Sequence, residues 1–378
     1  MPDTLKDDWE RIARSRYRGC LLGGAVGDAL GAPIEMMSWE KIQKTYGPQG
    51  ISDLAPAYGR IGAITDDTQM TLFTGEGLLR AQARFLERGI CNPFWVVQKS
   101  YLRWLATQES IPDDRHLETP LRCNTSWLFN LPQLHSCRLP GNTCLSSLRH
   151  SLNEGLREDS PPNDSKGCGG VMRIAPVGLF LQSPEDSKKS EGFVHYVMDF
   201  AGKIAKLTHG HVLSTLSSGA MAALVSLLVS GDDLPKALLV IQRVLDKSPN
   251  GSDLWELLKK AQTLAGHNIP PPLAIREIGE GWVAEEALAI GVYASLRGRS
   301  LEDALRIAVN HGGDSDSTGS IAGNIVGARY GVEAIPTGWL EKLELKNEIQ
   351  TMADDLLDFQ SWDIQDSENN GWSRYPPY

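Results

Sequence analysis

Apolar residues recur at helical spacing along almost the whole chain, and this periodicity is the feature that most restricts its fold. Alternating apolar and polar runs, which indicate half-buried strands, are nearly absent. The connecting segments are rich in proline, glycine and asparagine, as expected of loops. Helices are predicted over residues 9–32, 68–88, 93–108, 144–157, 193–207, 212–231, 234–245, 254–265, 283–296, 301–309, 317–330 and 349–359.

This pattern predicts an all-α protein built as a single large orthogonal multi-helix bundle. A chain of 378 residues can bury most of its apolar surface without disulfide bonds, and no low-complexity linker divides it. We expect one helical domain over residues 19–360, an N-terminal segment over 1–18 and an aromatic C-terminal tail over 361–378. The least regular stretch, 111–140, is interpreted as an insertion over one face, typical of a lid or specificity loop.

Charge and composition exclude several classes of protein. The chain has 37 basic and 47 acidic side chains, a net charge of −10, which argues against a standing nucleic-acid partner. Its start is charged and lacks the apolar core of a signal peptide, so a cytoplasmic protein is expected, with its six cysteines as free thiols. The uncharged run 212–231 is long enough to span a membrane, but four hydroxyl side chains in its first half favour a buried helix and no membrane association.

Two segments carry glycine at every fourth residue, which places the glycines on one face of a helix. Glycine at such positions lets another backbone approach closely, so the two helices are predicted to cross in the middle of the bundle. That crossing would bring the turn "APIE" near the motif "GGDSDS". The glycines are Gly23, Gly27 and Gly31 in the first segment and Gly319, Gly323 and Gly327 in the second.

Two acidic clusters stand at the predicted starts of helices that are far apart in sequence. Four carboxylates and two hydroxyls would form an oxygen cage for hard cations such as Mg²⁺ or Mn²⁺. Aspartate and threonine are also common N-caps, worth about 1 kcal/mol each, and one such cluster alone is more often a plain helix start. Two matching clusters favour the metal. They comprise Thr65, Asp66 and Asp67, and Asp314, Asp316 and Ser317.

Several motifs occur in an order that resembles the ADP-ribosylglycohydrolase family. They are "GCLLGGAVGDALGAPIE", "ITDDTQMT", "GGVMRIAPVGL", "LTHGH", "GWVAEEALAIGVYA" and "HGGDSDSTGSIAGNIVGARYG", and together they cover residues 19 to about 331. The resemblance implies an all-α fold with a central cleft that holds a binuclear magnesium or manganese site. It also implies an enzyme that removes ADP-ribose from modified targets.

The resemblance assigns roles to individual residues. It places Thr65, Asp66, Asp67, Asp314, Asp316 and Ser317 on two Mg²⁺ or Mn²⁺ ions, with serine at 317 where family members commonly have threonine. Glu35 matches a glutamate that works as a catalytic acid or base in some relatives, and we group Asp66 and Asp316 with it as catalytic candidates. Without the resemblance, Glu35 would be interpreted as a solvated carboxylate at a helix end.

One departure bears on the acid or base. Some relatives have a catalytic aspartate just before a Gly-x-Thr turn, where this chain has Leu139 and Pro140 before Gly141. Because of this difference, we assign the role of catalytic acid or base to Glu35.

The substrate's diphosphate needs donors of its own. Backbone N–H groups of Gly167, Gly169 and Gly170 are candidates, although a glycine run is more often a tight turn. The resemblance suggests that His209 contacts ADP-ribose, whereas His211 is interpreted as a helix cap or core residue.

The function expected from these residues is hydrolysis of ADP-ribose from modified protein side chains, with arginine the first acceptor because protonated guanidine is a stable leaving group. Three other possibilities stay open: a binuclear metal phosphohydrolase, a silent ADP-ribose-binding protein and a structural family member. Immunity against an ADP-ribosylating toxin is a further expectation, with residues 1–18 either a contact arm for that toxin or a plain first helix.

Overall fold

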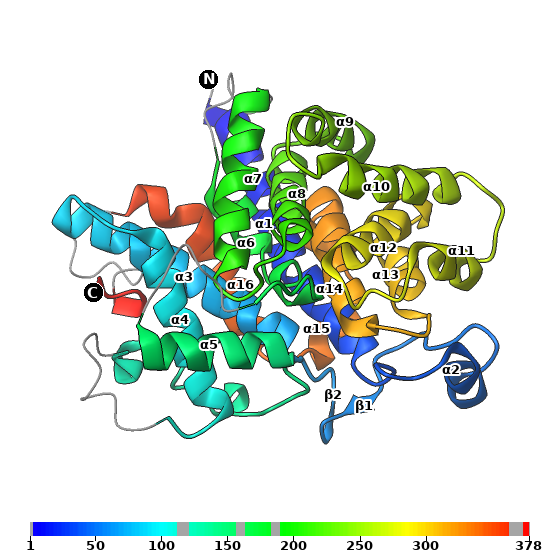
Figure 1. Cartoon of the computed structure of the whole chain (residues 1–378), viewed down its shortest axis with the longest axis horizontal. Helices are drawn as coiled ribbons and strands as arrows, with labels where there is room; N and C mark the ends of the chain where they lie inside the picture. The colour runs from blue at the N-terminus through cyan, green and yellow to red at the C-terminus, as the bar shows by residue number, and fades with distance from the viewer. Residues whose placement is uncertain (1–2, 112–120, 156–162, 183–189, 363–372, 378) are drawn as a thin grey trace.

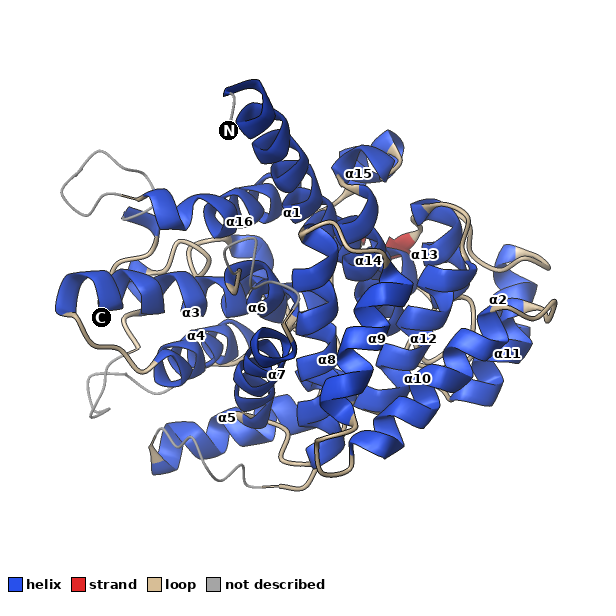
Figure 2. Cartoon of the chain, turned by 90° about the horizontal axis from the view of Figure 1, so that it is seen from above, coloured by secondary structure: helices blue, strands red, loops and turns tan. Residues whose placement is uncertain are grey.

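The computed structural model describes residues 3–111, 121–155, 163–182, 190–362 and 373–377. Within these ranges α-helices dominate, and the sheet consists of one short hairpin of β1 (Pro56–Ala57) and β2 (Arg60–Ile61). Figure 2 shows the same predominance of helix from a second direction. The prediction of an all-α multi-helix fold is confirmed.

Most predicted helices are present with their ends shifted by a few residues. Three agree to the residue: α4 (Pro93–Gln108), α9 (Leu234–Leu245) and α13 (Leu301–Val309). The others are α1 (Asp3–Gly31), α3 (Asp66–Arg88), α5 (Asn142–Glu154), α7 (Glu191–Lys206), α8 (Val212–Val229), α10 (Gly251–Ala265), α12 (Ala284–Arg297), α14 (Ser315–Tyr330) and α16 (Lys346–Asp358).

Sequence periodicity missed four short helices of six or eight residues each. Two turns of helix hold too few apolar positions for a period of 3.6 to stand out. These helices are α2 (Trp39–Tyr46), α6 (Ala175–Phe180), α11 (Pro271–Ile278) and α15 (Thr337–Lys342).

Helices α1 and α14 pack against each other (Figures 1 and 2). They run antiparallel, and their backbones touch along the two glycine rows. A Cβ atom on Gly23 would lie 2.6 Å from the carbonyl oxygen of Gly323. One on Gly31 would lie 2.5 Å from the Cα of Asp316. The predicted meeting of the two helices is therefore confirmed, and it brings the end of α1 against the start of α14.

Helix α8 is long and apolar enough to cross a membrane by length and composition alone. In the structure, 78% of it is buried, and it packs against α7, α9, α12 and α14. The burial agrees with the prediction of an internal helix of the bundle.

The first part of α1 is tied to the last long helix. Arg14 pairs with Asp358 at 2.8 Å, and Arg18 pairs with Asp354 at 2.7 Å. Helix α1 continues through residue 18 without a break. The division of the chain at residues 18 and 360 stays a prediction.

Part of the aromatic tail is docked. Tyr375 is buried, its hydroxyl donates to Asp355 at 2.8 Å, and its ring stacks on Trp362 with centroids 5.8 Å apart. Residues 363–372 and 378 of the predicted tail lie outside the described residues.

The buried carboxylate of Glu76 lies between α3 and α4, and arginine and hydroxyl donors compensate its negative charge. Glu76 accepts hydrogen bonds from Arg80 at 3.1 Å, Arg103 at 2.9 Å and Ser100 at 2.7 Å. Burial alone would raise the pKa of Glu76, but Arg103, Arg80 and the hydroxyl donors outweigh burial and lower it to about 2. Glu76 is therefore a charged structural group.

We expect Gly23→Ala to destabilise the fold by about 1–3 kcal/mol, because the added methyl group meets the α14 backbone, which cannot move aside cheaply. Gly192→Ala is the matched control, since a Cβ there meets no atom within 4 Å and alanine favours the helix. Urea unfolding of both variants tests this. Equal stability of the two variants would show that the α1–α14 contact tolerates a side chain.

Candidate active site

The first acidic cluster occupies the start of α3. Thr65 is the N-cap, and its hydroxyl accepts a hydrogen bond from the backbone N–H of Asp67 at 3.3 Å. Asp66 and Asp67 follow in the first turn, and both are buried. The Oδ1 atom of Asp67 has no hydrogen-bond partner among the described residues. Thr65 thus performs the capping, and the two carboxylates serve no capping role.

The second cluster begins α14. Asp314 stands at the N-cap position but makes no capping hydrogen bond with its side chain. Its Oδ2 atom instead accepts from the thiol of Cys168 at 2.8 Å. The Oδ1 atom of Asp316 accepts from the backbone N–H of Ser317 at 3.0 Å. Asp314, Asp316 and Ser317 are all buried, so this cluster needs an explanation beyond the one hydrogen bond that Asp316 accepts from the first turn of α14.

The fold brings the two clusters together at Asp316. Burial raises the pKa of Asp316, while hydrogen bonds with Asp314, the Ser317 N–H and Thr65 oppose that rise. After burial, Asp316 is also the charge that most raises the pKa of Asp66, Asp67 and Asp314. One carboxylate therefore interacts with both helix starts.

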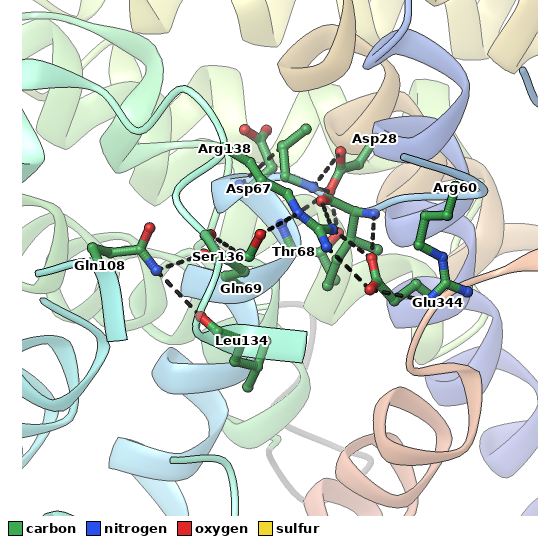
Figure 3. Close-up of polar contacts among 12 residues, drawn as sticks. Asp28, Arg60, Asp67, Thr68, Gln69, Gln108, Leu134, Ser136, Arg138 and Glu344 are labelled. Atoms are coloured by element: carbon green, nitrogen blue, oxygen red, sulfur yellow. Dashed lines mark hydrogen bonds and ion pairs between the residues drawn. The ribbon is translucent and has the colours of Figure 1, made fainter. Parts of the chain in front are cut away.

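Asp28, on α1, is a site residue that the sequence analysis did not assign. Its carboxylate is fully buried and accepts from the backbone N–H groups of Thr65, at 3.0 Å and 3.1 Å, and Thr68, at 3.2 Å, and from the Thr68 hydroxyl (Figure 3). Burial and then the charge of Asp316 raise the pKa of Asp28 to about 7. The available signal was an aspartate one turn after Gly24, in the second half of α1, which is otherwise small and apolar after Arg18.

Glu35 lies in the turn that follows α1 and faces the same cluster. Its Oε2 atom is buried and has no hydrogen-bond partner in the described part of the chain. Burial, followed by the charges of Asp316, Asp314, Asp66 and Asp28, raises the pKa of Glu35 to about 10. A carboxyl group in these surroundings holds its proton at neutral pH and can act as an acid.

The donors at this site suit a hard divalent cation. The predicted ligands present carboxylate and hydroxyl oxygens, one of them the unpartnered Oδ1 of Asp67. The charges that most raise the pKa values of Asp66 and Asp67 are all negative, and a bound cation would relieve this repulsion. Among the described residues, however, no three Asp, Glu, His or Cys side chains converge as a preformed metal-binding group.

The glycine-rich loop lies against His209. A Cβ on Gly169 would be 2.8 Å from the Cε1 atom of His209, and one on Gly167 would be 3.4 Å from its Nε2 atom. The Gly167 N–H already donates to the Ser165 hydroxyl at 3.3 Å. Burial and then Arg173 lower the pKa of His209 to about 3, so its imidazole is neutral. The loop and this histidine are thus adjacent, as a shared substrate contact requires.

His211 caps a helix, as the sequence predicted. It is the N-cap of α8, and its ring accepts from the backbone N–H of Leu213 at 3.1 Å.

A buried ion pair positions the segment that carries Thr65 (Figure 3). Arg138 donates to both carboxylate oxygens of Glu344 and to the carbonyl oxygen of Ile64. Glu344 accepts from the Ile64 N–H at 3.2 Å and from Arg60 at 3.0 Å. The start of α3 is therefore held on both sides by residues that no local sequence pattern connects.

The irregular segment 111–140 reaches the site at its C-terminal end. Arg138 belongs to it, and the N–H of the following Gly141 donates to Asp66. Leu139 adopts a left-handed conformation with φ of 54°. Residues 112–120 of this segment lie outside the described residues, and its role as a lid stays a prediction.

Comparison with known proteins identifies one family. The model of the family described as ADP-ribosylglycohydrolase matches residues 10–364. The chain is 28% identical to the ADP-ribosyl-[dinitrogen reductase] glycohydrolase of Rhodospirillum rubrum, over 90% of this chain and 95% of that protein. It is 24% identical to the ADP-ribosylarginine hydrolase Tri1 of Pseudomonas putida (strain GB-1), over 92% of this chain and 79% of that protein.

A mammalian relative and a solved structure also match this chain. The chain is 26% identical to the ADP-ribosylhydrolase ARH3 of Bos taurus, over 90% of this chain and 92% of that protein. A solved structure titled "ADP-ribosylglycohydrolase-related protein complex" superimposes with a TM-score of 0.61 at 24% identity. That comparison covers 92% of this chain and 99% of the solved one, and at this identity it shows a shared fold.

In the metal-free protein, we expect the free energy of unfolding to fall as the pH rises from about 7 to about 9, by on the order of 1 kcal/mol per pH unit. Glu35 has a pKa of about 10 in the fold against 4.5 when unfolded, so its stabilising contribution is complete below 4.5 and is lost as the pH rises through 10. Buried His209 titrates below this window and does not contribute to the slope.

Urea unfolding in EDTA measures this slope, and Glu35→Gln, which cannot titrate, should reduce it, while Asp66, Asp67 and Asp314, whose pKa values are also raised, keep their own contributions. A slope that is the same in both proteins would mean that Glu35 is not protonated in the fold.

Proposed function

The chain belongs to the ADP-ribosylglycohydrolase family, and on this premise we propose that it is a hydrolase that removes ADP-ribose from modified protein side chains. The observation that carries the proposal is the position of Asp316, the charge with the largest effect on Asp28, Glu35, Asp66, Asp67 and Asp314. Such a concentration of buried carboxylates is costly for stability and is typical of a catalytic site.

Arginine is the acceptor that we propose. One relative supports it by name, since it is an ADP-ribosylarginine hydrolase, and a second relative acts on an ADP-ribosylated protein, dinitrogen reductase. Hydrolysis forms a bond between water oxygen and C1 of the ribose and breaks the bond between C1 and the guanidine nitrogen. The released guanidine takes up a proton and is stable as a cation, which makes it a good leaving group.

The acidic residues divide into two proposed roles. Thr65, Asp66, Asp67, Asp314, Asp316 and Ser317 would hold two Mg²⁺ or Mn²⁺ ions. When bound, these cations would bind ribose hydroxyls and supply the positive charge that activates water. Glu35, with its unpartnered Oε2 atom, would exchange the proton with the reacting groups.

The remaining contacts concern ADP-ribose itself. We assign the loop at Gly167, Gly169 and Gly170 to the diphosphate, because backbone N–H groups suit phosphate oxygens. Neutral His209, which lies against this loop, would contact the same ligand as a hydrogen-bonding group without charge.

A cytoplasmic role in immunity against an ADP-ribosylating toxin is a finer proposal. The residues offered for contact with such a toxin include Arg14, which pairs with Asp358, so this part of α1 also has a structural task. Loss of toxin binding on deletion of residues 1–16 would support a contact arm, and unchanged binding would remove it.

The primary test is release of free ADP-ribose from an arginine-ADP-ribosylated protein, in Mg²⁺ and then in EDTA. We expect Asp316→Asn to reduce the rate at least 10²-fold, because it neutralises the carboxylate that interacts with every other member of the cluster. Asp253→Asn, at an exposed position on α10, is the matched control and should retain full activity.

Cation binding has its own measurement. Mg²⁺ or Mn²⁺ should raise the Tm of the wild type and of Asp253→Asn, and should not raise that of Asp316→Asn.

Two outcomes would replace the proposed reaction. Release of inorganic phosphate in place of intact ADP-ribose would identify a phosphohydrolase. Tight binding of ADP-ribose with no turnover of any linkage would identify a silent binding protein.

A further inference from the structure

The hairpin of β1 and β2 carries a tyrosine at its turn. Tyr58 and Gly59 are the two central residues, with φ of 49° and 81°. A turn with both central residues in the left-handed region favours asparagine followed by glycine, since a bulky side chain is strained at the first position. Strained backbone held by the surrounding structure is found preferentially at functional sites.

The ring of Tyr58 is tied to the segment that begins the acidic site. The guanidinium of Arg138 lies 5.6 Å from the ring centroid, and Arg138 also donates to the carbonyl oxygen of Ile64, next to Thr65. Burial, and then the charges of Glu35, Asp316, Asp28 and Asp66, raise the pKa of the Tyr58 phenol well above its ordinary value. The ring therefore lies within electrostatic reach of the acidic cluster.

Tyr58 is partly open to solvent. The residue is 40% exposed, so Arg138 does not cover it completely. The charge of Arg138 is compensated by its two hydrogen bonds to Glu344. Glu344 is shared with Arg60, so the attraction for a further cation comes from the acidic cluster on the other side of the ring, and a planar guanidinium stacks on an aromatic face.

Two further exposed residues, each next in sequence to a residue of the site, also have a left-handed backbone conformation. Met36 follows Glu35 with φ of 63° and is exposed, and Leu139 follows Arg138 with φ of 54° and is exposed. Three apolar side chains in unfavourable backbone conformations thus stand next to residues of one site.

We propose that Tyr58 selects the acceptor, its open face stacking on the guanidinium that links ADP-ribose to arginine. This inference rests on the proposed function and specifies its substrate class. A hydroxyl-linked substrate offers no planar cation, so Tyr58 discriminates between the two linkages. Free ADP-ribose lacks the acceptor altogether and gains nothing from the ring.

The test uses Tyr58→Asn, which removes the ring and installs the residue that this turn prefers. We expect the KM for an arginine-ADP-ribosylated peptide to rise about 5- to 30-fold with kcat nearly unchanged. We expect the affinity for free ADP-ribose, measured by calorimetry, and the Tm to be maintained. Tyr58→Phe keeps the aromatic face and should stay within about twofold of the wild type.

Tyr330→Asn is the matched control. Tyr330 is 39% exposed and also contacts an arginine, with the guanidinium of Arg329 4.7 Å from its ring, but it lies at the opposite end of α14 from the acidic site. It should change none of these quantities.

Two results would overturn the role of Tyr58 alone: an unchanged KM for the arginine-linked peptide, or an equal loss of affinity for free ADP-ribose. Wild-type protein that releases no ADP-ribose from the arginine-linked peptide in Mg²⁺ would overturn the proposed function together with this inference.

Discussion

The backbone contact between α1 and α14 is the constraint on which the site depends. Glycines face one another along both helices, so the helix axes approach more closely than side chains would permit. At one end of this pair, Asp28 and the Glu35 turn come against the start of α14, where Asp316 lies. A side chain in either row would separate the groups whose mutual repulsion defines the site.

Two glutamates show how partners decide the state of a carboxyl group. Glu76 is buried and Glu35 is half-buried, and the loss of water by itself raises the pKa of each. Glu76 lies among Arg80, Arg103 and hydroxyl donors, and its pKa falls to about 2. The charges that most affect Glu35 are carboxylates, and together with burial they raise its pKa to about 10. The first arrangement stabilises the fold, and the second leaves a group that is prepared to exchange a proton or to accept a cation.

Interactions from distant parts of the chain hold the start of α3 in place. Asp28 accepts hydrogen bonds from the N–H groups of Thr65 and Thr68. Glu344 accepts from the N–H of Ile64, the residue before Thr65, and Arg138 donates to its carbonyl oxygen. The backbone that carries Asp66 and Asp67 is thereby fixed in position, and their carboxylates do not serve as helix caps. The same Arg138 connects this support to Tyr58, so the positioning of the acidic cluster and of the hairpin are parts of one network.

Local sequence patterns were enough to predict the helical class, most helix positions, the two glycine rows and the two acidic clusters. Each of these is a local pattern of period, spacing or capping that needs only neighbouring residues to be visible. Tertiary structure alone decided that Thr65 is the cap and its aspartates are not, that Asp28 belongs to the site, and that Arg138, Glu344 and Tyr58 lie together. These assignments depend on contacts between residues up to about 280 positions apart, such as Ile64 and Glu344, and no local pattern encodes such a contact.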